Sequence, residues 1–67
     1  MNLQQLIDFI KYQGIYDIRT NSWNNNCEIW SHKGVRSYNF DTESELKAFL
    51  TGVYYTSVDL LERAKHE

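Results

Sequence analysis

The single cysteine of this 67-residue chain constrains its fold more than any other feature. Domains this small often depend on disulfides or on a structural metal ion. Cys27 has no partner for an intramolecular disulfide, and a structural zinc site needs about four Cys or His ligands at short spacing, whereas the chain adds only His32 and His66. We therefore expect one globular domain, residues 1–67, that is stabilised by side-chain packing, without a metal ion or a cofactor.

The first helix is predicted over residues 3–13, because apolar residues recur there at helical spacing. Its apolar stripe comprises Leu3, Leu6, Ile7 and Ile10. Asn2 is a favourable N-cap, and Gln5, three residues later, predicts a capping box. Gly14 follows at the position where a left-handed residue commonly ends a helix.

A second helix is predicted after Thr42, which forms a capping box with Glu45. Acidic residues at its start complement the helix dipole. Its apolar stripe comprises Leu46, Phe49, Leu50, Val53, Ser57, Leu60, Leu61 and Ala64. The stripe keeps its phase through Gly52, which favours one long helix over two helices that are separated at this glycine.

Three strands are predicted between the helices, over residues 15–21, 27–32 and 35–40. These segments are rich in β-branched and aromatic residues, and turn residues separate them. Short connections predict an antiparallel meander, so the fold class is α+β with the order α-β-β-β-α. Both helices are expected to pack on the one apolar face of the sheet, which leaves the other face in water.

The turn between the second and third strands sets their register. A two-residue Lys33–Gly34 loop pairs Cys27 with Phe40 and Trp30 with Ser37. This register puts Cys27, Ile29, Tyr38 and Phe40 on the apolar face, and it puts Glu28, Trp30, His32, Val35, Ser37 and Asn39 on the open face, together with Asp17 and Arg19 of the first strand. A three-residue loop would pair Ser31 with Val35 instead. Because a shift of one residue moves every side chain to the other face, the register that buries the apolar set is preferred.

The open sheet face is the predicted contact surface for a partner. Trp30, Arg19 and His32 are expected on it, and Trp and Arg are favoured anchors at interfaces. Trp23, in the Asn-rich turn, is a further candidate, since loop aromatics often serve recognition. Alternatives stay open for both tryptophans: Trp30 covers a neighbour or lies in the core, and Trp23 folds over the sheet edge.

A second contact surface is predicted on the long helix. Ala48 and Gly52 are small residues that allow another helix to approach closely, and Tyr55 beside them is a usable anchor. These residues predict a possible homodimer face. The alternative is a glycine that the helix tolerates at a cost of about 1 kcal/mol.

Several classes of function are disfavoured. Cys27 and His32 fall on opposite strand faces, so they do not form a nucleophile–base pair, and no other acid–base pair indicates an enzyme. A net charge of −2 makes nucleic acid an unlikely partner. No apolar run approaches the roughly 18 residues of a membrane span, and the N-terminus does not resemble a signal peptide. The lone cysteine favours the cytoplasm as the location.

The α-β-β-β-α order resembles the topology of double-stranded RNA-binding domains. The resemblance stops there, because the last helix begins DTESE, where that family places a basic cluster, and NSWNNN stands in place of its histidine-bearing loop. In size and composition the chain looks like the small accessory proteins of tailed bacteriophages, which commonly bind and modulate or inhibit a host protein. Such a protein would act in the host cytoplasm. The predicted function is a non-enzymatic protein-binding module; the alternative is a weak single-stranded nucleic-acid binder that stacks bases on Trp30 and Trp23.

Overall fold

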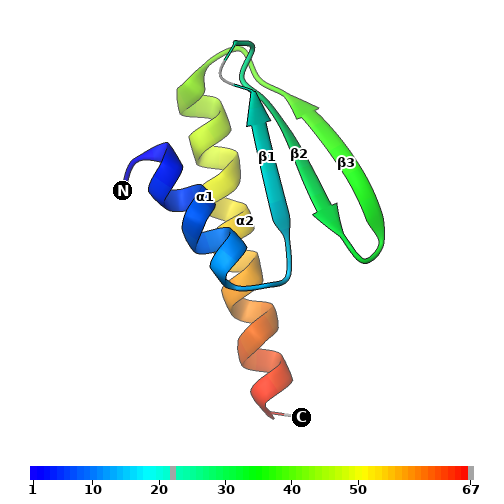
Figure 1. The fold of residues 1–67 in the computed structure, drawn as a ribbon. Coiled ribbons are helices and arrows are strands. Elements are labelled where there is room, and N and C mark those ends of the chain that lie inside the picture. The colour runs from blue at the N-terminus through cyan, green and yellow to red at the C-terminus, as the bar shows by residue number, and fades with distance from the viewer. Residues whose placement is uncertain (22, 67) are drawn as a thin grey trace.

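The computed structural model describes residues 1–21 and 23–66, and the side chain of His66 lies outside the described part. Its elements are, in chain order, α1 (Leu3–Tyr12), β1 (Asp17–Asn21), β2 (Asn26–Ser31), β3 (Gly34–Asn39) and α2 (Glu43–His66). The strands form an antiparallel sheet in the order β1-β2-β3 (Figure 1). The α+β meander that the sequence predicted is therefore confirmed.

Helix α1 is fixed at its start by the predicted capping box. The side-chain oxygen of Asn2 accepts a hydrogen bond from the Gln5 backbone N–H at 2.8 Å, and the Gln5 side chain accepts one from the Asn2 N–H at 2.9 Å. The helix ends at Tyr12, and Gly14 follows with a φ of +79°. Two otherwise unpaired backbone donors are thus satisfied at the N-terminus, which is the usual reason that such a box stabilises a helix.

Helix α2 is one continuous helix of 24 residues that runs through Gly52, as predicted. The Thr42 hydroxyl accepts a hydrogen bond from the Glu45 N–H at 3.1 Å, while the Glu45 carboxylate accepts one from the Asp41 N–H at 3.4 Å. At 1.5 Å per residue, the helix is about 36 Å long. Its C-terminal turns consequently extend beyond α1 and the sheet (Figure 1).

The core lies between the two helices and one face of the sheet. Its buried members are Leu6, Ile7, Ile10, Ile18, Cys27, Leu46 and Leu50. Ser57 of α2 is also buried, and its hydroxyl donates a hydrogen bond to the Tyr54 carbonyl at 2.7 Å, so no buried polar side chain is left unsatisfied in the described part. Both helices contribute to this cluster together with Ile18 and Cys27, which places them on the same face of the sheet.

The predicted register of β2 and β3 is wrong by two residues. Cys27 pairs with Tyr38, and Trp30 pairs with Val35. The loop consists of His32 and Lys33, and neither has a positive φ, whereas Gly34 has a φ of +124° at the start of β3. The prediction placed lysine in a primed turn, which requires positive φ; in the structure glycine alone carries that conformation. Because the shift is even, every residue that remains in a strand stays on its predicted face. The prediction for His32 is wrong, because His32 lies in the turn and not on the open face of a strand.

The two helices cover the apolar face unevenly. Helix α1 lies against β1 and α2, whereas β3 meets α2 mainly through three aromatic rings at one end. The ring centroids of Tyr38 and Phe49 are 4.6 Å apart, and those of Phe40 and Phe49 are 5.2 Å apart. Beyond this contact, β3 and α2 diverge toward the β2–β3 turn (Figure 1). Tyr38, Phe40 and Phe49 are therefore only partly buried.

Candidate functional site

Trp30 lies on the open face of the sheet, in the middle of three adjacent strands. It is directly opposite Asp17 of β1 and Val35 of β3. Its side chain is 38% exposed, and Val35 is 44% exposed. Two apolar side chains thus stand side by side on a surface that neither helix covers, and Trp30 is not part of the core.

Arg19 lies over the ring of Trp30. Its guanidinium carbon is 4.7 Å from the ring centroid, a cation–π contact between neighbouring strands. Such a contact at an exposed site contributes about 0.5–1 kcal/mol, and it fixes the orientation of both side chains. We call Trp30, Val35 and Arg19 the open-face patch.

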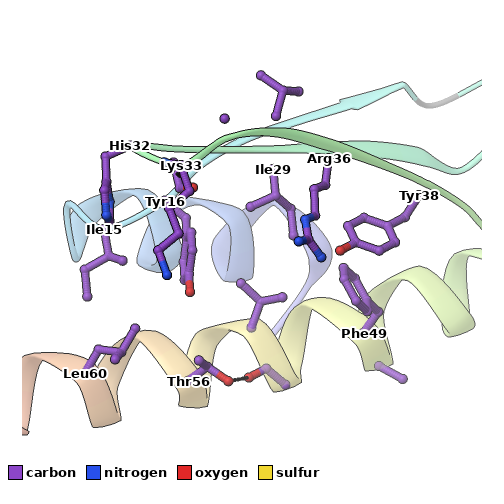
Figure 2. A pocket seen from close by; sticks show the side chains of 16 residues that line it. Ile15, Tyr16, Ile29, His32, Lys33, Arg36, Tyr38, Phe49, Thr56 and Leu60 are labelled. Atoms are coloured by element: carbon purple, nitrogen blue, oxygen red, sulfur yellow. Dashed lines mark hydrogen bonds between the residues drawn. The ribbon is translucent and has the colours of Figure 1, made fainter.

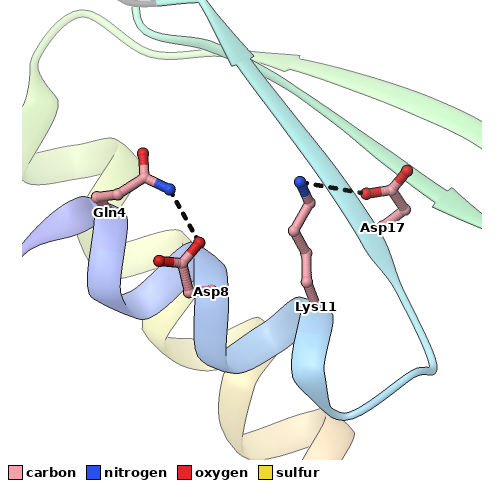
Figure 3. A network of polar contacts seen from close by, with 4 residues as sticks. All are labelled: Gln4, Asp8, Lys11 and Asp17. Carbon is pink, nitrogen blue, oxygen red and sulfur yellow. Dashed lines mark hydrogen bonds and ion pairs between the residues drawn. The ribbon is translucent and has the colours of Figure 1, made fainter.

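His32 lies at the edge of the open-face patch, in the exposed β2–β3 turn. It shares a shallow hollow of about 420 Å³ with Trp30 and with the junction between α1 and β1. At that junction the Lys11 ammonium lies 3.7 Å from an Asp17 carboxylate oxygen (Figure 3). Both side chains of this ion pair are about half exposed, so the pair contributes at most about 1 kcal/mol to stability. Its main consequence is to connect the end of α1 to the strand that flanks Trp30.

The structure separates Trp23 and Tyr55 from the open-face patch. Trp23 is 92% exposed in the β1–β2 loop, where its backbone N–H donates to the Asn21 side-chain oxygen at 2.9 Å. Trp23 precedes β2, which begins at Asn26. Asn26 is four residues from Trp30, which corresponds to about 13 Å along the strand. Tyr55 projects from α2 with its ring 5.5 Å from that of Tyr54, on the helical side of the molecule. A single partner would have to be large to contact Trp23, Trp30 and Tyr55 at the same time.

Cys27 and His32 have different environments. Cys27 is buried beneath the sheet, and burial raises the pKa of its thiol, which disfavours the thiolate. His32 is in the exposed turn. Among the described side chains, those of residues 1–21 and 23–65, no three of the types His, Cys, Asp and Glu gather in a group that could hold a metal ion.

Two features of the surface were not recognised from the sequence. Val35 joins Trp30 because of the corrected register, although its place on the open face was predicted. Arg36 pairs with Ile29 on the helix-facing side of the sheet, where a charged residue is unusual. The strand alternation of β3 could have predicted this position, since Arg36 falls on the same strand face as Tyr38 and Phe40.

Helices α1 and α2, as far as they are described, contain no stretch that is both long and apolar enough to cross a bilayer. Comparison of the chain with family models, with curated proteins and with solved structures finds no match. The surface of the protein is therefore the remaining source of information about its function.

Proposed function

We propose that this chain is a small non-enzymatic protein-binding module that acts by covering a surface of another protein with its open-face patch. The observation that carries the proposal is the exposed pair of Trp30 and Val35 on a sheet face that no helix covers. Tryptophan and arginine are enriched among the residues that dominate binding energy, and Arg19 lies on Trp30.

The setting of Trp30 favours binding because the side chain is already oriented. Its neighbours on β1 and β3 flank the indole, and Arg19 lies against the ring. An anchor that is held in place before binding loses less conformational entropy on association. The patch can therefore contribute most of the affinity of a modest interface.

The charges around the patch favour a protein over a nucleic acid as the partner. Asp17 and Glu28 lie on the open face on either side of Arg19. Binding to phosphates depends on an excess of basic residues, which this face lacks. Arg19 also occupies the face of the indole ring that a base would use for stacking.

The proposed setting is the cytoplasm. A chain of this size and composition suits the role of a phage-type accessory protein, in which it would modulate or inhibit a host protein by blocking its surface.

Affinity purification from cells that naturally contain the chain tests the proposal. Wild type and Tyr12→Ala should retain the same protein in near-stoichiometric amount, whereas Trp30→Ala should lose it. Tyr12 is the matched control because it is an exposed aromatic residue on α1, 87% exposed and outside the patch. Circular dichroism should show that both variants fold, since neither side chain belongs to the core.

Two outcomes would contradict this function. Retention of the partner by Trp30→Ala would exclude the patch as the contact surface. Quenching of tryptophan fluorescence by a single-stranded oligonucleotide, weakened by salt, would favour the nucleic-acid alternative instead.

A further inference from the structure

A second surface is a groove on the other side of the sheet from the Trp30 indole, and it meets the open-face patch only at Val35 on the edge strand β3. It lies between the β2–β3 hairpin and α2, and its volume is about 900 Å³ (Figure 2). Side chains from both walls face its interior: Ile29 and Arg36 from the sheet, and Phe49, Thr56 and Leu60 from α2. We call this feature the hairpin–α2 groove.

The hairpin–α2 groove is closed at one end and open at the other. The contacts of Tyr38 and Phe40 with Phe49 close the end near the β3–α2 connection. At the open end, Leu60 lies on α2 with 39% of its surface exposed. The groove follows α2 from Ala48 to Leu60, which corresponds to about 18 Å of helix.

The helical wall of the groove permits close approach of another backbone. Ala48, Gly52 and Thr56 are spaced four residues apart along this flank of α2. A Cβ atom added at Gly52 would meet no atom within 4 Å, and the Thr56 hydroxyl already donates to the Gly52 carbonyl at 2.9 Å (Figure 2). The flank therefore presents a shallow surface without an unpaired hydroxyl group, which suits helix axes about 8–10 Å apart.

The two charged residues that line the groove, Lys33 and Arg36, are both basic. No carboxylate lines it among the described residues, although the whole chain has a net charge of −2. The two ion pairs of the described part involve Lys11 and Arg63 and leave Arg36 and Lys33 unengaged. The guanidinium of Arg36 reaches into the groove from β3 (Figure 2). The apolar walls thus adjoin a basic rim, and a matching ligand would be apolar with carboxylates along one margin.

The shape of the groove favours an α-helix as the occupant. The outer edge of β3 offers free backbone groups to an added strand. A segment that lies along the α2 flank instead meets side chains, so its own N–H and C=O groups must pair internally, which a helix achieves within one segment. A length of about 18 Å accommodates roughly twelve residues, or three turns.

We propose that the hairpin–α2 groove binds an acidic amphipathic helix of a partner protein. The apolar stripe of that helix packs against Ile29 and the Ala48–Gly52–Thr56 flank of α2, and its flanking carboxylates meet Arg36 and Lys33. This site goes beyond the function proposed above, because it lies on the opposite side of the sheet and each site can fail without the other.

A peptide selection tests this assignment with probes of defined chemistry. The library consists of displayed 16-residue helical peptides with a fixed leucine stripe and randomised polar positions, and it is selected on the wild-type protein. Clones should be enriched in Asp and Glu beside the stripe. A synthetic peptide from such a clone should shift amide resonances of residues that line the groove in NMR spectra.

Two variants distinguish the groove from other surfaces. Arg36→Glu places a like charge against the acidic margin and should weaken the selected peptide about tenfold at low salt, with a smaller effect at high salt. Gly52→Leu fills the helical wall and should weaken it at least as much. Trp30→Ala is the matched control and should leave the affinity unchanged, because the indole lies on the open face.

Several results would overturn the proposal. These are a selection that yields no binders, clones without acidic enrichment, and peptides whose affinity Arg36→Glu and Gly52→Leu do not change. Saturable binding of dodecanoate that displaces the peptide would assign the groove to a small carboxylated lipid. A wild-type dimer in sedimentation equilibrium that Gly52→Leu abolishes would assign it to a second copy of this chain, whose α2 mixes acidic and basic residues.

Discussion

Replacing Leu50 with alanine should lower the free energy of unfolding by about 3 kcal/mol. Leu50 is completely buried in α2 among the core residues. The substitution removes three carbon atoms, each of which contributes about 0.8 kcal/mol when it is transferred from water. The cavity that remains adds to this loss, and measured Leu→Ala changes in cores are about 2–5 kcal/mol. For a chain of this length, whose total stability is about 3–10 kcal/mol, the loss is a large fraction.

Leu60→Ala is the matched control, since it makes the same chemical change in the same helix. Leu60 is 39% exposed at the open end of the hairpin–α2 groove. It loses less buried surface than Leu50 and leaves no closed cavity, so the expected change is about 1 kcal/mol, roughly a third of that at Leu50. The ratio of the two effects therefore measures how far the groove is open in solution.

Urea denaturation followed by circular dichroism at 222 nm gives both values. Backbone ellipticity is the better signal because it reports the unfolding of α1 and α2 directly, whereas Trp23 is 92% exposed and its indole is already solvated in the folded protein. Equal slopes of the unfolding transitions are required before the midpoints are compared. If Leu60→Ala destabilised the chain as much as Leu50→Ala, the C-terminal half of α2 would be packed against the hairpin, and the hairpin–α2 groove would not be open in solution.

Three further predictions concern the backbone and the core. Gly52→Ala should raise the free energy of unfolding by about 0.5–1 kcal/mol, because the added methyl group meets no atom within 4 Å. Gly34→Ala should lower it by about 1 kcal/mol, because the φ of Gly34 is +124°. Urea midpoints of the two variants that move in the same direction would contradict this. Asn2→Ala removes the capping box of α1 and should cost about 1 kcal/mol, measured as a lower thermal midpoint. Burial raises the pKa of the Cys27 thiol above its ordinary value of 9.0, so the unfolded chain ionises first, and stability is retained below this pH and lost as the pH rises above it. Relative to Cys27→Ala, the wild type should therefore lose stability as the pH rises above 9.0, and parallel pH profiles would exclude this cause.

Local residue patterns were sufficient to predict the helices and strands of this protein and the face on which its strand residues lie. Helical spacing located α1 and α2, and the side chains of Asn2 and Thr42 marked their starts, because capping depends on residues that are close in sequence. Strand alternation assigned Cys27 and Trp30 to opposite faces. That assignment survived a misplaced turn, since a register shift of two residues leaves the parity of every position unchanged.

The surfaces that a partner can reach depend on how the helices and the sheet pack against one another, which local patterns do not specify. The contact of Phe49 with Tyr38 and Phe40 sets the angle between α2 and β3, and these rings come from different elements. The hairpin–α2 groove and the inward position of Arg36 follow from that angle. The separation of Trp23 from Trp30 likewise depends on the length of β2 and on the turn at its start. Local propensity specifies how each segment folds, whereas the spaces between segments depend on how distant side chains pack against one another.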